Sequence, residues 1–176
     1  PMLDAILNTG DATTDPKVRA QCCIVLAWFE SKYRADAVAP ELRDVLSSAK
    51  ASAQQALDAT PEPSVQDVVA LLDTVPHVWG DDLRRPFTLN PSFESSRLVG
   101  AADADWITEQ TLYDCKCSGQ KRPFRRYELL QMLGYMLLDT NDSFMLQSAG
   151  WYYARQQKRI VYPVTALIER VFGTTN

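Results

Sequence analysis

Two short runs that favour extended structure follow each other closely in this chain, and they constrain its fold more than any other feature. Residues 99–107 and 111–116 are rich in β-branched, aromatic and small side chains, and the polar segment 108–110 separates them. Two such runs joined by a short turn are typical of a β-hairpin. The pattern therefore predicts an antiparallel pair of strands in the C-terminal half of the chain.

The second strand carries an acid and a lysine on one face, because side chains of a strand alternate between two faces. Asp114 and Lys116 share a face with Leu112, whereas Tyr113 and Cys115 lie on the other face, which we expect to point into the core. The face opposite the core would thus present a carboxylate beside an ammonium group.

The first strand adds two acids, Asp103 and Asp105, which share a face with each other. Facing residues on paired strands sit roughly 4.5–5.5 Å apart at Cβ, and like charges in that position destabilise a hairpin unless something compensates them. A divalent cation would do so. Mg²⁺ prefers carboxylate, carbonyl and water oxygens, and two acids with the backbone carbonyl of Cys115 would supply part of its coordination shell.

A cation, two carboxylates and a lysine suit the hydrolysis of a phosphodiester. The metal polarises the scissile phosphate and lowers the pKa of a bound water. Lys116 would orient that water, help to deprotonate it, or offset the charge that develops on phosphorus.

Three short motifs occur in order around this region: Gly-x-x-Asp at residues 100–103, Asp-x-Lys at 114–116 and Gln-x-x-x-Tyr at 131–135. In this respect the chain resembles the PD-(D/E)XK nuclease superfamily, and most closely its RecB-like branch. A looser similarity extends from residue 89 to residue 155 and covers roughly half of the chain.

The resemblance implies an α/β (α+β) fold, a restriction-endonuclease-like core in which helices flank a central mixed sheet. It also implies that Asp103 and Asp114 bind Mg²⁺ or Mn²⁺, that Lys116 is the catalytic lysine, and that Gln131 and Tyr135 complete the pocket from the following helix. The glycine spacing of the first motif selects Asp103 over Asp105, which would serve as a second acid or only as a hydrogen-bond acceptor.

Each motif also has an ordinary structural interpretation. Asp-x-Lys is a common tripeptide that often lies on a solvated strand. Gln131 and Tyr135 are four residues apart and therefore share a helix face. Because apolar residues such as Met132 and Leu133 surround them, a buried structural tyrosine is the alternative there.

A compact basic segment follows the proposed catalytic strand and contains Lys121, Arg122, Arg125 and Arg126. The net charge of −4 opposes binding to a nucleic acid, since neutralisation of phosphates by Lys and Arg supplies most of that affinity. The position of the segment next to the acids favours a nucleic-acid contact. The alternative is a solvated loop.

The four cysteines lack the spacing of a zinc site, and the only histidine is His77. No cysteine follows Cys117, so an iron–sulfur cluster of the kind found in some RecB-like nucleases is not expected. Cys115 and Cys117 fall on the predicted core face, where reduced thiols behave as small hydrophobes. We therefore expect neither zinc nor a cluster.

A chain of 176 residues is long enough for one buried core, and we expect one nuclease domain, with a helical N-terminal part at 1–76 and the catalytic core at 77–176. The sequence has no apolar run long enough to cross a bilayer and no signal sequence, so we expect a cytoplasmic protein without a membrane partner. Pro1 before Met2 indicates a tag remnant or an excised piece.

The remaining sequence predicts an alternation of helices with further strands. Proline and polar breaks delimit them. We expect helices at 16–33, 40–57, 64–72, 124–138 and 164–172, an edge strand at 87–89, and strands at 144–155 and 159–162.

The sequence thus predicts a Mg²⁺- or Mn²⁺-dependent nuclease that acts on DNA. One alternative is an RNA substrate, because the catalytic groups do not read the 2′-hydroxyl. Another is a nucleic-acid-binding or assembly subunit that keeps the nuclease fold and cleaves only with a partner such as a helicase or an ATPase.

Overall fold

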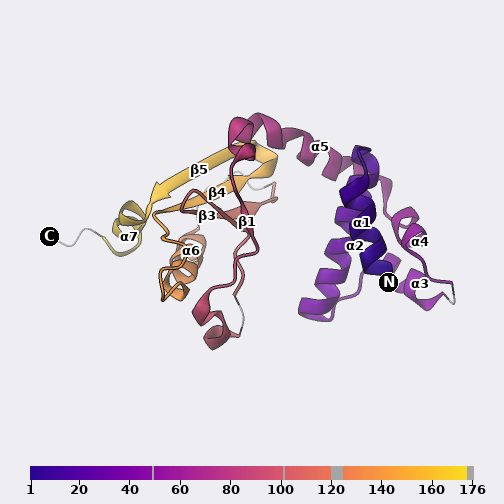
Figure 1. The fold of residues 1–176 in the computed structure, drawn as a ribbon, viewed down its shortest axis with the longest axis horizontal. Coiled ribbons are helices and arrows are strands. Elements are labelled where there is room, and N and C mark those ends of the chain that lie inside the picture. Colours follow the sequence, from indigo (N-terminus) through magenta and orange to yellow (C-terminus); the bar gives the residue numbers. More distant parts are fainter. Residues whose placement is uncertain (49, 101, 120–124, 174–176) are drawn as a thin grey trace. The chain divides into compact units, whose positions relative to one another are not determined.

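A computed structural model describes residues 1–48, 50–100, 102–119 and 125–173. The chain forms two compact units, residues 1–73 and residues 74–176. The boundary falls inside helix α5 (Glu62–Trp79), close to the point where the sequence separates a helical part from a mixed part. Figure 1 labels helices and strands of both units.

The first unit is helical. Asp15 caps α2, since its side chain accepts a hydrogen bond of 2.8 Å from the Lys17 amide, and Pro16 occupies the first helical position. This agrees with the predicted helix start. Besides the first part of α5, the helices of the unit are α1 (Met2–Ala12), α2 (Pro16–Ala35), α3 (Pro40–Ser47) and α4 (Ala53–Asp58).

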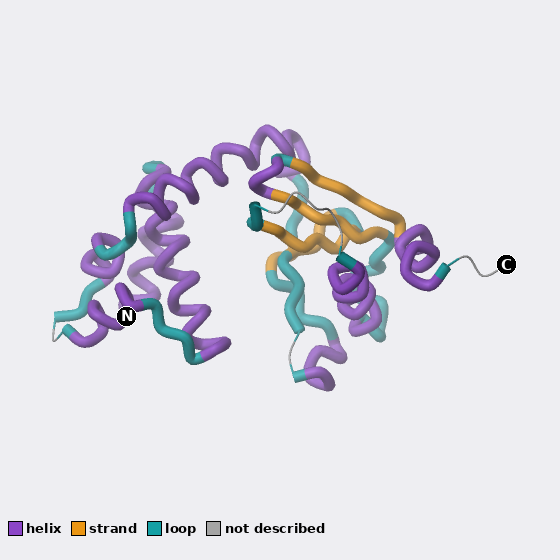
Figure 2. The backbone as a smooth tube through the Cα atoms, turned by 180° about the vertical axis from the view of Figure 1, so that it is seen from behind, coloured by secondary structure: helices purple, strands orange, loops and turns teal. Residues whose placement is uncertain are grey.

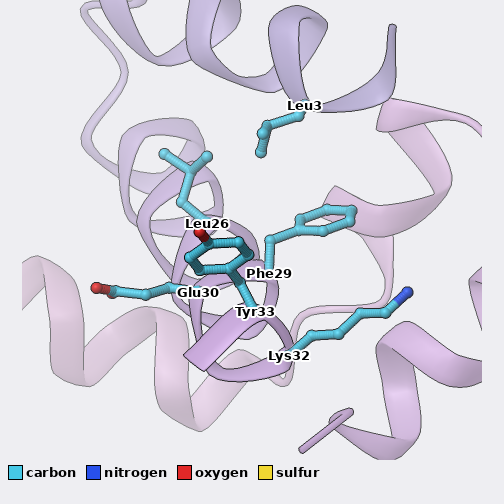
Figure 3. Close-up of a pocket in the computed structure, with 6 residues that line it drawn as sticks. All are labelled: Leu3, Leu26, Phe29, Glu30, Lys32 and Tyr33. Atoms are coloured by element: carbon cyan, nitrogen blue, oxygen red, sulfur yellow. The ribbon is translucent and has the colours of Figure 1, made fainter. Parts of the chain in front are cut away.

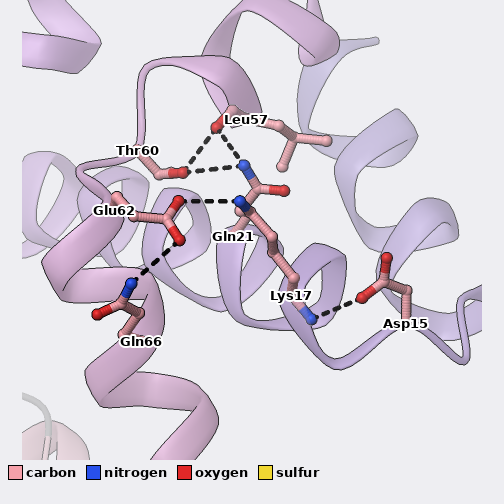
Figure 4. Close-up of polar contacts among 7 residues, drawn as sticks. All are labelled: Asp15, Lys17, Gln21, Leu57, Thr60, Glu62 and Gln66. Carbon is pink, nitrogen blue, oxygen red and sulfur yellow. Dashed lines mark hydrogen bonds and ion pairs between the residues drawn. The ribbon is translucent and has the colours of Figure 1, made fainter.

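Apolar side chains from three of these helices form the core of the first unit: Ile6, Cys22, Val25, Ala56 and Leu57. Polar contacts tie α2 to the later helices, as Figure 4 shows. Lys17 donates to Glu62 at 2.9 Å, and the amide of Gln21 donates to the carbonyl of Leu57 and the hydroxyl of Thr60.

The prediction of one helix over 40–57 is wrong, because the chain forms two helices there. α3 gives way to an extended residue at Ser48. The hydroxyl of Ser52 then accepts a hydrogen bond of 3.2 Å from the Gln55 amide and caps α4. Serine side chains compete for backbone donors in this way and so favour helix ends over helix interiors.

The prediction that the third helix ends before Pro76 is also wrong, since α5 continues to Trp79. Proline inside a helix removes one backbone hydrogen bond and crowds the preceding turn. The packing of the last residue of the helix, Trp79, offsets this cost of Pro76. The indole of Trp79 is 4% exposed and packs edge-on against a set of aromatic rings in the second unit, namely Phe87, Trp106, Tyr113 and Tyr152.

The second unit is a five-stranded mixed sheet with helices, which confirms the mixed α/β class. In sheet order the strands are β1 (Thr88–Leu89), β2 (Trp106–Thr108), β3 (Thr111–Lys116), β4 (Ser148–Tyr153) and β5 (Lys158–Pro163). β3 and β4 pair in parallel, and the remaining neighbouring strands pair antiparallel. Figure 2 shows them from behind as orange segments.

Helix α6 (Arg126–Leu138) lies between β3 and β4 in the chain, and α7 (Val164–Phe172) follows β5. Three short 3₁₀ helices complete the unit: η1 (Gly80–Arg84), η2 (Glu94–Val99) and η3 (Ala154–Gln156). The predicted bounds of α7 are confirmed, and β1 is the expected edge strand. No helix in the described part of the chain is long and apolar enough to cross a bilayer.

The predicted hairpin is present, with Trp106 opposite Tyr113 and Thr108 opposite Thr111. Glu109 and Gln110 form its two-residue turn, with φ of 46° and 60°, as the twist of paired strands favours. The first strand is shorter than predicted and begins at Trp106, because the side chain of Asp105 takes the Cys115 amide as a donor at 2.5 Å. The Asp105 carboxylate thus accepts the hydrogen bond of the Cys115 amide in place of a backbone carbonyl of the neighbouring strand.

Both faces of β3 are buried, which corrects the prediction of a single core face. Leu112, on the face of Asp114, is fully buried in a cluster with residues of α6, β4 and α7, while Tyr113 on the opposite face is 4% exposed beside Trp79. A parallel strand pair requires a crossover connection that covers one face of the sheet. The end of α5 covers the other.

The prediction that Cys115 and Cys117 are buried is wrong in part. Cys115 is half-buried, and Cys117 is exposed because β3 ends at Lys116. On α2, Cys22 is buried and Cys23 is exposed, as expected for adjacent residues that point in different directions around a helix.

Candidate active site

Asp114, the acid of the proposed catalytic strand, is buried, with 7% of its surface exposed. Its Oδ2 lies 2.7 Å from Nζ of Lys116, and the geometry of this ion pair leaves that oxygen without a well-aligned donor. Burial raises the pKa of Asp114; the Lys116 ammonium opposes the shift, and the negative charges of Asp105 and Glu128 add to it. The site therefore holds more negative charge than one lysine balances.

Lys116 is affected by the same carboxylates. Burial favours its neutral form, but the pair with Asp114 and the charges of Asp114, Glu128 and Asp105 outweigh that effect and raise its pKa. Lys116 is consequently held as an ammonium beside Asp114. A charged lysine of this kind can bind a phosphate oxygen or neutralise developing charge.

Asp105 enters the cluster through its hydrogen bond to the Cys115 amide. Asp105 directly precedes Trp106, the residue of β2 that pairs with Tyr113. The negative charge of Asp105 adds to the raised pKa of Asp114, so the two carboxylates are close enough to interact. This is the like-charge arrangement that a cation would relieve.

Glu128 is the member of the cluster that the sequence analysis missed. It lies in the first turn of α6, is 9% exposed, and accepts a hydrogen bond of 2.8 Å from the Arg125 amide. An acid three residues after a helix cap is a recognised start signal, so the pattern identifies Glu128 as a capping residue. Its contribution to the charge at Asp114 follows only from where α6 packs.

Asp103 is exposed and is paired with Ser92 in an isolated antiparallel bridge. The glycine of its motif has a local role: Gly100 ends η2 in the left-handed region, with φ of 81°, and its amide donates to the carbonyl of Ser96. Glycine adopts that conformation without strain.

Gln131 and Tyr135 share a face of α6, as predicted. The amide of Gln131 donates to the hydroxyl of Tyr135 at 3.1 Å, and the Tyr135 ring stacks on Phe93 with centroids 6.1 Å apart. The ring is half-buried and packs at the margin of the core, so it is not the fully buried tyrosine of the structural interpretation.

The basic segment is only partly within the described residues. Lys121 and Arg122 lie outside them, while Arg125 and Arg126 are exposed at the start of α6. Arg125 and Arg126 therefore precede Glu128 by two or three residues, at the N-terminal end of α6.

The donor set at this site is of the kind that suits a hard divalent cation, because three carboxylates and a carbonyl outnumber one ammonium. The buried Oδ2 of Asp114, which lacks a well-aligned donor, also fits such a ligand. Within the described ranges, however, no three Asp, Glu, His or Cys side chains are already arranged to hold an ion. Binding would require side-chain rearrangement.

Two other pockets lie away from the cluster. Figure 3 shows one on the first unit, where Leu3, Leu26, Phe29 and Tyr33 form an apolar lining with Glu30 and Lys32 beside it. The other, of about 300 Å³, lies on the second unit and contains two arginines in ion pairs with acids: Arg85 with Asp82 and Glu109, and Arg159 with Asp82.

Comparison of the chain with protein-family models, curated proteins and solved structures gave no match.

Proposed function

We propose that this chain is a divalent-metal-dependent nuclease that hydrolyses phosphodiester bonds of DNA. The observation that carries the proposal is the ion pair of the buried Asp114 with the half-buried Lys116, on which the charges of two further carboxylates, Asp105 and Glu128, act. An ammonium among carboxylates is an arrangement that phosphate hydrolysis uses, because one group binds metal and the other stabilises negative charge.

The topology supports the proposal. A hairpin that carries the acids, a crossover helix and a parallel strand follow in the order expected of a restriction-endonuclease-like core. We propose this core for the second unit. Gly100 and Asp103 then lie between η2 and β2, the second motif lies on β3 and the third on α6.

In the proposed reaction, Asp103 and Asp114 are the metal ligands named by the motifs, with the carbonyl of Cys115. Asp105 is the second acid that the sequence suggests, and Glu128 is an acid that the packing of α6 adds. The bound Mg²⁺ or Mn²⁺ would polarise the phosphate and lower the pKa of a water.

Lys116 would hold the attacking water or a phosphate oxygen through its ammonium, whose three N–H donors allow this while it stays beside Asp114. Gln131 and Tyr135 would line the pocket. Arg125 and Arg126, with the neighbouring Lys121 and Arg122, would contact the DNA backbone and give affinity that falls with salt.

The test is cleavage of linear and circular, single- and double-stranded DNA, with an RNA control, in Mg²⁺, Mn²⁺ or EDTA. The wild type is compared with Lys116→Ala and with Lys158→Ala, a matched change at the exposed start of β5. Metal-dependent products that disappear only in Lys116→Ala support the proposal. Products from RNA but from no DNA would identify RNA, and not DNA, as the substrate.

A second candidate is a nucleic-acid-binding or assembly subunit that cleaves only with a partner such as a helicase or an ATPase. The observation that favours it is the lack, in the described part of the chain, of three acidic, histidine or cysteine side chains already placed around one ion. DNA binding without products in any metal would support this candidate over the first.

A further inference from the structure

Two cysteines flank the proposed catalytic lysine, and their sulfur atoms lie 3.8 Å apart. Cys115 is half-buried at the end of β3, and Cys117 is exposed just beyond it. Neither is in a disulfide. Residues two apart on an extended strand point to the same side, which explains why these sulfurs are close.

The backbone on both sides of this pair is held by side chains. The Cys115 amide donates to Asp105 at 2.5 Å, and the carbonyl of Cys117 accepts from Nε of Arg155 at 2.6 Å. The next carbonyl, that of Ser118, accepts from Gln156 at 3.1 Å. These contacts keep the two sulfurs near each other, with Lys116 between them.

We propose that Cys115 and Cys117 form a reversible disulfide under oxidation by a peroxide, and that this disulfide switches off the Lys116 site. The effect on cleavage rests on the proposed nuclease function; the formation of the bond does not.

The oxidation balances with hydrogen peroxide as the oxidant. The exposed sulfur of Cys117 attacks one peroxide oxygen, the O–O bond breaks, and a sulfenic acid and one water form. The sulfur of Cys115 then attacks the Cys117 sulfur, the S–O bond breaks, and a second water leaves as the S–S bond forms. Two thiols lose two electrons and two protons, and the peroxide takes them up.

The geometry gives the disulfide an effect on Lys116. An extended strand rises about 3.2–3.4 Å per residue, so Cα atoms two residues apart are separated by roughly 6.4–6.8 Å. Disulfides span about 4.4–6.8 Å and most often 5.5–6 Å. Closing this one therefore shortens the strand at Lys116, the residue between the two cysteines, and draws its ammonium away from Asp114. A strained, accessible bridge is also easily reduced.

The experiment treats the full chain with hydrogen peroxide and digests it with trypsin after denaturation and blocking of remaining thiols. Cleavage after Lys116 separates residues 98–116 from residues 117–121, so a disulfide between Cys115 and Cys117 appears as these two peptides joined. We expect the joined peptides in the wild type, their release by dithiothreitol, and their absence in Cys117→Ser. Separate, unlinked peptides after oxidation would overturn the proposal.

Two further measurements test whether the disulfide changes the environment of Lys116 and the cleavage of DNA. An amine-reactive ester should label Lys116 more after oxidation in the wild type, and equally before and after in Cys117→Ser. DNA cleavage should fall about 10²-fold, as expected when a catalytic group is displaced by an ångström, and should return with dithiothreitol. Cys23→Ser, a change at the exposed cysteine of α2, should behave as the wild type.

A joined peptide pair with unchanged labelling of Lys116 would overturn the switch. If the reduced protein cleaves no nucleic acid, the nuclease proposal fails, and the peptide and labelling measurements still decide this one.

Discussion

The ring of Tyr113 on β3 occupies the space where a side chain at Gly150 on β4 would lie. The two residues face each other across the parallel pair, and a Cβ built on Gly150 would overlap Cε1 and Cδ1 of the ring. Trp79 and Trp106 pack on the ring and restrict its movement. Glycine is thus required here by close approach of a neighbour.

We expect Gly150→Ala to lower the free energy of unfolding by about 1–3 kcal/mol, the usual cost of an overfilled core, as measured by urea denaturation. Gly134→Ala is the matched control. Apart from the chain neighbours and the backbone of α6 itself, no atom lies within 4 Å of a Cβ at Gly134, so the same change there should stabilise through helix propensity. Equal effects at both positions would contradict the packing argument.

Glu128→Gln should separate charge from helix capping. The amide oxygen of glutamine can still accept from the Arg125 amide, so α6 keeps its first turn, while the cluster loses one negative charge. We expect at least about a tenfold fall in metal-dependent cleavage, from weaker attraction of the cation, with little change in the unfolding midpoint. Glu169→Gln, at an exposed position of α7, should leave cleavage unchanged. Full activity of Glu128→Gln would remove this acid from the site.

Trp79→Ala should destabilise the second unit by about 3–5 kcal/mol, the range for loss of a buried tryptophan. The indole contacts four aromatic rings, and the guanidinium of Arg159 lies 4.7 Å from its centroid. The exposed Leu83 in η1 offers a control, since Leu83→Ala removes a large apolar side chain without creating a cavity. Comparable losses of stability in the two variants would show that α5 is not anchored by Trp79.

The ion pair of Lys17 and Glu62 predicts a pH dependence of the first unit. The hydrogen bond from Lys17, followed by that from Gln66, lowers the pKa of Glu62 below its ordinary value. The carboxylate is therefore favoured in the folded chain, and its contribution is present above the unfolded pKa and is lost as the pH falls through the folded one.

Between neutral pH and about pH 3, the unfolding midpoint of the wild type should fall further than that of Glu62→Gln. Lys17→Met should remove the same difference, and high salt should reduce it, because the pair is exposed. A parallel decline in wild type and Glu62→Gln would show that this pair adds nothing.

Local patterns were sufficient for several elements of this fold. Asp15 and Pro16 mark the start of α2, the two polar residues at 109–110 mark the hairpin turn, and α7 has the predicted bounds. Each of these depends on side chains within a few residues of the backbone they organise. The same locality explains why Asp114 and Lys116 were assigned to one strand face.

Features that depend on distant packing were not accessible to the same patterns. The continuation of α5 past Pro76 depends on aromatic rings at 106, 113 and 152 that bury Trp79. The place of Glu128 in the acidic cluster depends on where α6 packs against β3. No periodicity in the sequence indicates how Trp79 or α6 packs against residues far away in the chain.

The register of β3 has a further consequence, which concerns the order of folding. Its partners in β2 are three to seven residues away in sequence, from Thr108 with Thr111 to Trp106 with Tyr113, whereas every pair with β4 spans 37 residues. The entropy of closing a loop grows with its length, and non-local pairing slows folding.

Substitutions at Ile107 should therefore slow folding more than substitutions at Ala149, as φ-values would record. We expect the strand that carries the acid and the lysine to pair with its hairpin neighbour before its parallel neighbour. The proposed site would then be complete only when α6 has packed on the sheet.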